Sequence, residues 1–217
     1  MTVYAVANPK GGVGKSTVST NLAGLLASRG QAVALGDMDR QESARLWLGL
    51  RPANLAPITH WPVEADAVGR LPRGCAHGVL DTPAGLTGKP LRAVLKRVDR
   101  IIVPLQPSVF DIFATRAFIT ELLTQRRADD VQVAVLANRV REHSHSAEQL
   151  DHFLADLGVR SLGHLRDTQN YVHLAAHGLT LWDVAPGRVE RDLEQWQAVI
   201  AWLDAPGAGS SASGAAA

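Results

Sequence analysis

A glycine-rich segment close to the first residue has the composition of a phosphate-binding loop. Residues 8–17 read Asn-Pro-Lys-Gly-Gly-Val-Gly-Lys-Ser-Thr, between an apolar run at 3–7 and an apolar-periodic stretch at 18–28. Glycines let backbone N–H groups approach an anion closely at the start of a helix, where the helix dipole favours negative charge. Lys15 adds a point charge for the β- and γ-phosphates, and Ser16 offers a hydroxyl to Mg²⁺. Strand, loop and helix together therefore predict a nucleotide phosphate site.

Apolar runs and amphipathic stretches alternate along most of the chain. Strands are predicted at 3–7, 32–36, 78–80, 100–104, 131–137 and near 162–165, with an edge strand near Ile58. Helices are predicted at 18–28, 41–50, 109–126, 147–157, 171–177 and 190–203. This rhythm predicts an α/β fold with a mostly parallel central sheet flanked by helices on both faces.

Polar side chains stand where several of these predicted strands end. In open α/β sheets, ligands bind beyond the carboxyl ends of the strands. The polar residues at those ends are Asn8, Asp37, Asp81 and Asn138. We therefore expect these four residues to share one site with the phosphate loop.

The overall composition is that of a single globular domain. The chain has 217 residues, of which 46% are hydrophobic and 20% charged, and we expect a domain over 1–203 followed by a flexible Gly/Ala/Ser tail over 204–217. A single cysteine, Cys75, excludes a disulfide framework and a Cys-ligated cluster within one chain. No long apolar stretch predicts a transmembrane helix, and the first strand leaves no room for a signal peptide, so we expect a cytoplasmic protein.

A second lysine distinguishes this loop from the ordinary one. Pro9 stands where the first glycine of Gly-x-x-x-x-Gly-Lys-[Ser/Thr] belongs, and Lys10 follows it. Lys-Gly-Gly-x-Gly-Lys-[Ser/Thr] is the deviant Walker A motif, and at this point the chain resembles the ParA/MinD family of P-loop ATPases. The resemblance implies slow, partner-stimulated hydrolysis of ATP with Mg²⁺, and an ATP-sandwich homodimer in which Lys10 reaches the partner's nucleotide. The alternative is that Lys10 is a solvated loop lysine.

The same resemblance assigns roles to the acidic residues. Asp37-Met38-Asp39 resembles the family's Asp-x-Asp-Pro-Gln element, with Arg40 in place of proline. It implies that Asp39 orients the attacking water and that Asp37 helps to hold the Mg²⁺ hydration shell. A helix N-cap is the alternative for either aspartate. The apolar run ending in Asp81-Thr82-Pro83 resembles a Walker B element, which implies that Asp81 holds Mg²⁺ through water together with Ser16.

The residues expected to contact the base of the nucleotide lie in the later half of the chain. Asn138-Arg139 resembles the family's adenine-side asparagine, although a strand-end turn would also favour asparagine. Residues 165–180 resemble the segment that closes over the base. The residues that the resemblance assigns to ATP are Lys10, Gly11, Gly12, Val13, Gly14, Lys15, Ser16, Thr17, Asn138 and Arg139, with Lys10, Lys15 and Asp39 catalytic.

Members of the family bind either DNA or membranes, and the arginines of this chain favour DNA as the partner. By resemblance to ParA-like members, nonspecific DNA contacts are expected from Arg166, Arg188 and Arg191, within a wider set that includes Arg139, Arg141 and Arg160. A second candidate set is Lys89, Arg92, Lys96, Arg97 and Arg100, in which Arg92, Lys96 and Arg100 are predicted to share one helical face at i, i+4, i+8. The Gly/Ala/Ser end lacks the basic amphipathic helix of MinD-like members, so no membrane partner is expected. Trp196 and Trp202 are expected in a core or interface.

The phosphate loop begins within the first ten residues, so no helix-turn-helix is expected before it. The resemblance therefore implies a short, nucleoid-associated, ParA-like ATPase that partitions or positions a plasmid, a chromosome or a protein cargo such as a carboxysome or chemotaxis cluster. Its expected partner is a cargo-linked adaptor or ParB-like activator. The alternatives are a MinD-like spatial regulator and a P-loop ATP-dependent metabolic ligase.

Overall fold

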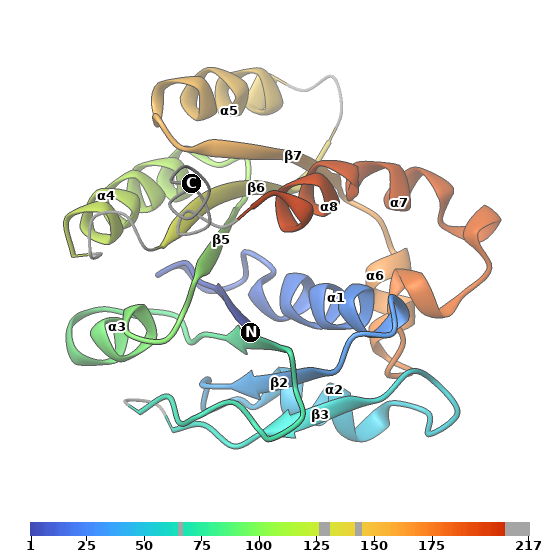
Figure 1. Ribbon diagram of the computed structural model, residues 1–217. Coiled ribbons are helices and arrows are strands. Elements are labelled where there is room, and N and C mark those ends of the chain that lie inside the picture. The colour runs from blue at the N-terminus through green and yellow to red at the C-terminus, as the bar shows by residue number, and fades with distance from the viewer. Residues whose placement is uncertain (65–66, 126–130, 142–144, 207–217) are drawn as a thin grey trace, which may run out of the picture.

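The protein folds around one sheet of seven strands. The computed structural model describes residues 1–64, 67–125, 131–141 and 145–206 (Figure 1). All pairings between neighbouring strands are parallel, in the order β3-β2-β4-β1-β5-β6-β7. The strands are β1 (Thr2–Val6), β2 (Val33–Asp37), β3 (Ile58–Trp61), β4 (His77–Asp81), β5 (Arg100–Leu105), β6 (Gln132–Val140) and β7 (Arg160–Arg166). The predicted parallel sheet is confirmed, with the segment near Ile58 forming one edge.

Helices cover both faces of this sheet, as predicted. They are α1 (Lys15–Ser28), α2 (Ser43–Leu50), α3 (Gly88–Leu95), α4 (Val109–Gln125), α5 (His145–Asp156), α6 (Asn170–Ala175), α7 (Glu190–Gln195) and α8 (Gln197–Asp204), with short 3₁₀ turns η1 (Leu181–Asp183) and η2 (Pro186–Arg188). Figure 1 shows α3 and α4 on one side of the sheet and α1, α6, α7 and α8 on the other.

Each face has its own hydrophobic core, because side chains alternate along a strand. On β1, Val3 and Ala5 pack with residues of α3, α4 and α5, whereas Tyr4 and Val6 pack with residues of α1, α2 and α6–α8. The sheet is therefore buried on both sides, which explains why its strands read as continuous apolar runs.

The C-terminal helical region confirms one prediction and corrects another. Trp196 and Trp202 are buried, at 0% and 3% exposure, as expected for core residues. Trp196 donates from its indole N–H to the Tyr171 hydroxyl at 3.0 Å and packs edge-on against Trp182. The single helix predicted over 190–203 is instead two helices that meet at Trp196. The tail predicted over 204–217 lies mostly outside the described residues.

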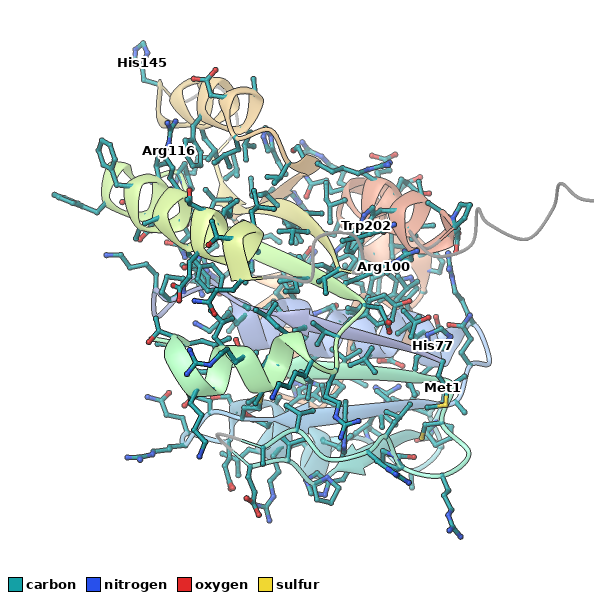
Figure 2. All side chains as sticks on the ribbon, turned by 60° about the vertical axis from the view of Figure 1, so that its left-hand side comes forward. Met1, His77, Arg100, Arg116, His145 and Trp202 are labelled. Atoms are coloured by element: carbon teal, nitrogen blue, oxygen red, sulfur yellow. The ribbon has the colours of Figure 1, made fainter. Side chains whose placement is uncertain are left out.

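The predicted helical face of Arg92, Lys96 and Arg100 is wrong. Helix α3 ends at Leu95, and Arg100 begins β5 with only 5% of its surface exposed. Its guanidinium donates to the backbone carbonyls of Trp202, Leu203 and Ala205, and it lies over the Trp202 ring (Figure 2). A cation at a helix C-terminus satisfies carbonyls that have no partner within the helix. Arg100 is thus buried and hydrogen-bonded to the C-terminal end of α8, so it cannot belong to an exposed basic surface.

In the part of the chain that the structure describes, no helix has both the length and the apolar character needed to cross a membrane.

Replacing Arg100 by methionine should destabilise the fold. The substitution keeps much of the side-chain length but leaves three carbonyls without their donor, which should lower the free energy of unfolding by about 2–3 kcal/mol. Urea denaturation followed by circular dichroism measures this change. Arg92→Met, on an exposed residue, is the control and should change stability by less than about 0.5 kcal/mol. Equal stability of Arg100→Met and the unmodified protein would show that the hydrogen bonds from Arg100 to the end of α8 do not stabilise the fold.

Candidate functional site

The phosphate loop lies between β1 and α1, at the carboxyl edge of the sheet. Gly12 and Gly14 have positive φ angles of 77° and 92°, in the left-handed region that glycine adopts most easily. A Cβ on Gly14 would lie 2.0 Å from Nδ2 of Asn138. This amide donates to the Val13 carbonyl at 2.8 Å, and Nε2 of Gln106 donates to the Gly12 carbonyl at 2.8 Å. Side chains from the ends of β5 and β6 therefore hold the loop in shape.

Asn8 fixes the start of the loop. Its Oδ1 accepts the Lys10 N–H at 2.9 Å, while its Nδ2 donates to the Pro104 carbonyl at 2.8 Å and to the Thr115 hydroxyl at 3.0 Å. Asn8 is completely buried. The sequence placed Asn8 at the site, and the structure assigns it an anchoring role that its position alone did not reveal.

Lys15 lies folded into the loop that precedes it. Its Nζ donates to the Lys10 carbonyl at 2.6 Å, and the residue is 7% exposed. Burial lowers the pKa of Lys15, while the charges of Asp81 and Asp39 act in the opposite direction. The ammonium group is thus close to two carboxylates and to the loop backbone, which suits a cation that neutralises phosphate charge. Lys10 itself is half-buried.

Asp81 is the most perturbed acid of the site. It ends β4 beside Asp37 of β2, and it is 1% exposed. Burial raises the pKa of Asp81 to about 7; the nearby hydroxyls of Ser16 and Ser19 and the charge of Lys15 oppose this rise, and the charge of Asp37 adds to it. The Ser19 hydroxyl donates to Oδ1 at 3.2 Å, but among the described residues Oδ2 has no hydrogen-bond partner.

An unpartnered, buried carboxylate oxygen next to a serine hydroxyl fits a Mg²⁺ site. Mg²⁺ prefers hard oxygen ligands and commonly takes one or two carboxylates plus phosphate and water oxygens. Within the described ranges no group of three or more His, Cys, Asp or Glu side chains could hold a metal by itself. Asp81 and Ser16 would therefore hold the ion together with the phosphates of a nucleotide.

Asp37 and Asp39 are both engaged with backbone N–H groups. Asp37 accepts the N–H of Asp39 at 2.9 Å through Oδ1, and those of Ala44 and Arg45 at 2.8 and 3.1 Å through Oδ2. Asp37 thus satisfies N–H groups in the first turn of α2, although the N-cap residue of that helix is Glu42. Asp39 is half-buried and accepts the Gln41 N–H at 3.0 Å. The Mg²⁺-shell role of Asp37 and the water-orienting role of Asp39 stay predictions.

A cavity of about 560 Å³ adjoins the loop on the side of β6 and α6. Its lining residues are Thr17, Asn138, Arg139, Arg166, Asp167, Thr168, Gln169, Tyr171, Val172, Ala175 and Ala176. This volume is within the range of small-ligand sites. The structure thus brings Asn138, Arg139 and the segment following β7 to one cavity, as the base-side prediction requires. The Asn138 amide already bonds the Val13 carbonyl and the Arg139 N–H, so the segment 166–169 is left to supply further polar contacts.

The three arginines predicted to contact DNA do not form one exposed group. Arg166 lines the cavity and pairs with the buried Asp192, at 2.6 Å from Nε to Oδ1 and 3.2 Å from Nη2 to Oδ2. Arg188 and Arg191 are exposed on η2 and α7. Their contact with DNA stays a prediction.

The sequence did not reveal a buried ion pair that joins two segments of the site. Arg51, just after α2, donates to both carboxylate oxygens of Asp183 at 2.8 and 2.9 Å, and both side chains are 5% exposed. Burial would raise the pKa of Asp183, but hydrogen bonds from Arg51 and Thr180 outweigh it and lower this pKa. The pair links the C-terminal end of α2 to η1. The two residues are far apart in sequence, and no local pattern marked them as partners.

Comparison with known proteins places the chain among nucleotide-binding domains. Residues 4–181 match the family model of the CobQ/CobB/MinD/ParA nucleotide binding domain. Maintenance of carboxysome distribution protein A of Halothiobacillus neapolitanus is 28% identical over 196 residues, covering 87% of this chain and 90% of that protein. Its namesake of Gloeobacter kilaueensis is 38% identical over 114 residues, covering about half of each chain (51% and 51%).

The fold agrees with a solved relative. An ATP complex of a variant of McdA from Cyanothece superposes with a TM-score of 0.71 at 16% identity, covering 92% of this chain and 96% of that one. The seven-stranded parallel sheet, the loop between β1 and α1 and the family match over most of the length agree with one another. The chain therefore belongs to the CobQ/CobB/MinD/ParA family of nucleotide-binding domains.

Proposed function

We propose that this chain is a Mg²⁺-dependent ATPase of the ParA type. The observation that carries the proposal is the buried Asp81, whose free Oδ2 lies in the site with Ser16 and the folded-in Lys15. Lys15 and the loop N–H groups bind the phosphates, Asp81 and Ser16 hold the ion, and Asp39 orients the attacking water. Mg²⁺, when bound, neutralises charge on the phosphate oxygens. The protein's part is positioning and electrostatics.

The proposed ATPase is a switch between a monomer and an ATP-bound dimer. Lys10 lies in the phosphate loop and is only half-buried, so its side chain is available to a second copy across the site. In the dimer, Lys10 of each copy contacts the nucleotide of the other. Asn138 and Arg139 at the base-side cavity, with Thr17, complete the site for ATP.

We propose that the ATP-bound dimer binds nonspecific DNA of the nucleoid and positions a cargo, with an adaptor or ParB-like activator stimulating hydrolysis. Similarity to one carboxysome distribution protein over 87% of the chain supports a large protein assembly as cargo, and a plasmid or chromosome is the alternative. Hydrolysis would then release the protein from DNA and reset the cycle.

ATP should switch DNA binding on. Binding to a nonspecific duplex is measured with ATP, with ADP and without nucleotide over a salt series. We expect binding with ATP alone, and an affinity that falls linearly on logarithmic axes with a slope of about −0.9 per phosphate neutralised. Lys15→Ala, which removes the phosphate-binding charge, should bind DNA in none of these conditions. Absence of binding in every nucleotide state, with ATP hydrolysis intact, would refute the DNA-based function.

Asp39→Ala should leave ATP binding intact and stop hydrolysis, because the attacking water loses its orienting carboxylate. Dimers formed with ATP should then persist, and light scattering after size-exclusion chromatography should show a stable dimer where the unmodified protein returns to a monomer as ATP is consumed. Lys15→Ala is again the matched control and should stay monomeric. A monomeric Asp39→Ala in saturating ATP would contradict the role given to Asp39.

Asp81→Asn should make the folded protein more stable and abolish its ATP hydrolysis. The folded-state pKa of Asp81, about 7, is above its ordinary value of 3.8. The folded, nucleotide-free protein therefore holds this proton more tightly than the unfolded chain, and its free energy of unfolding should fall as the pH rises from about 4 to 7. The substituted amide has no charge to bury, so the variant should be more stable at pH 8, by at most about 4 kcal/mol.

Chemical denaturation across this pH range, together with a phosphate-release assay, tests this prediction. The variant should lose Mg²⁺-dependent ATP hydrolysis while gaining stability, whereas the exposed control Glu194→Gln should keep both the pH slope and the activity. An unchanged pH slope in Asp81→Asn would show that Asp81 is already ionised in the free protein.

A further inference from the structure

One stretch of the chain carries positive charge almost without negative charge. Between residues 67 and 98 the only carboxylate is Asp81, which is buried in the nucleotide site. The same stretch contains six cationic residues, all exposed: Arg70, Arg73, Lys89, Arg92, Lys96 and Arg97. An excess of exposed positive charge creates a field that attracts polyanions.

The fold brings cations from both ends of this stretch to one cavity. Residues 67–76 lead into β4, and α3 runs back from the carboxyl end of β4 to the start of β5. Arg70 and Arg97 line a common cavity of about 420 Å³, whose other lining residues include Met1 and Asp99. Asp99 is partly satisfied, because its Oδ2 accepts the Val3 N–H at 2.6 Å. Figure 2 labels Met1 and His77, which lie at the paired starts of β1 and β4.

Three of the remaining cations, Arg73, Arg92 and Lys96, are close in sequence to Arg70 and Arg97. Lys96 is the C-cap of α3 and follows Arg92 by one helical turn, with its N–H bonded to the Arg92 carbonyl at 3.2 Å. Arg73 lies in the turn closed by the Cys75 N–H and the Pro72 carbonyl, three residues after Arg70. We call Arg70, Arg73, Arg92, Lys96 and Arg97 the α3 basic surface.

The C-terminal region predicted to contact DNA has the opposite balance. Residues 183–204 contain two arginines, Arg188 and Arg191, and five carboxylates: Asp183, Glu190, Asp192, Glu194 and Asp204. Glu190 and Glu194 are exposed on α7 beside Arg191. Arg166 is already paired with Asp192. Asp183 and Asp192 are buried in ion pairs, so phosphates approaching this region would meet the exposed carboxylates of Glu190 and Glu194 as well as the arginines.

We propose that the α3 basic surface is where nonspecific duplex DNA binds, its arginines and lysine contacting the phosphate backbone. This inference rests on the proposed DNA-based function and names its binding surface. Arginine donates bidentate hydrogen bonds to phosphate, and such contacts fix a protein on the duplex without reading the base sequence.

The position of α3 also explains how ATP would control this surface. Helix α3 begins seven residues after Asp81, and the connecting segment is bonded to the end of β1 and to the phosphate loop. The Thr82 hydroxyl donates to the Val6 carbonyl at 2.9 Å, and the Gly85 N–H donates to the Pro9 carbonyl in the phosphate loop at 2.8 Å. A change in the loop on phosphate binding would therefore reach the segment that leads to α3 through the Gly85–Pro9 hydrogen bond.

The test compares two double variants that remove the same charge from different surfaces. Arg70→Ala/Arg97→Ala alters the α3 basic surface, and Arg188→Ala/Arg191→Ala alters the C-terminal region. Binding to a nonspecific duplex of about 60 base pairs is measured with ATP over a salt series, and ATP hydrolysis is measured in parallel to confirm a folded nucleotide site. We expect the first variant to bind at least about tenfold more weakly, with a salt slope reduced by about two per bound protomer. The second should bind within about threefold of the unmodified protein.

The outcomes separate this inference from the function on which it rests. If the unmodified protein fails to bind DNA with ATP, the proposed function and this inference both fail. If it binds and Arg70→Ala/Arg97→Ala binds equally well, only the α3 basic surface is refuted. Equal losses in both variants would also overturn it, because overall charge and not this surface would then govern binding.

Discussion

The geometry of the nucleotide site depends on one close approach, between Asn138 and the phosphate loop. The Asn138 amide reaches the Val13 carbonyl across a space that only a glycine at position 14 leaves open. The sheet order makes this contact available, because β5 lies between β1 and β6 and the carboxyl ends of all three strands meet at one edge. Asn8 and Gln106 add two further polar contacts to the same loop. A loop held at several points keeps its N–H groups oriented before any phosphate arrives, so little conformational entropy remains to be lost on binding.

Next to this loop, the carboxyl group of Asp81 lies in an environment that disfavours its ionised form. Asp81 is buried next to another aspartate and leaves one oxygen without a partner among the described residues. Such a group lowers stability in the free protein and becomes favourable only when a cation or a donor joins it. The neighbouring Asp37 avoids the same penalty because three backbone N–H groups satisfy it. Two aspartates that look equivalent in the sequence therefore differ in chemistry.

The sequence predicted those features that depend on local patterns. Apolar runs marked six of the seven strands, and the glycine-lysine-serine spacing marked the loop, because both signals lie within about ten residues. The edge strand near Ile58 has no such run, since its two middle residues are exposed. Local patterns could not show that Arg100 bonds carbonyls about a hundred residues away, so its spacing from Arg92 and Lys96 was mistaken for a helical face. The Asn138–Val13 and Arg51–Asp183 contacts were missed for the same reason, since each joins segments more than a hundred residues apart. Likewise, Arg166 looked like a surface cation until the fold placed Asp192 beside it.

The proposed dimer offers a simple way for a nucleotide to control DNA binding. In the proposed dimer, ATP joins two copies of the α3 basic surface into one body, so the second surface binds at a high effective concentration once the first is in place. Because each phosphate contact multiplies affinity, doubling the number of contacts changes the binding constant far more than twofold. A single surface of five cations can thus be too weak to hold a monomer on DNA and still retain a dimer. Dimerisation alone would then make binding depend on ATP, and the Gly85–Pro9 contact would add to this dependence by adjusting the position of α3.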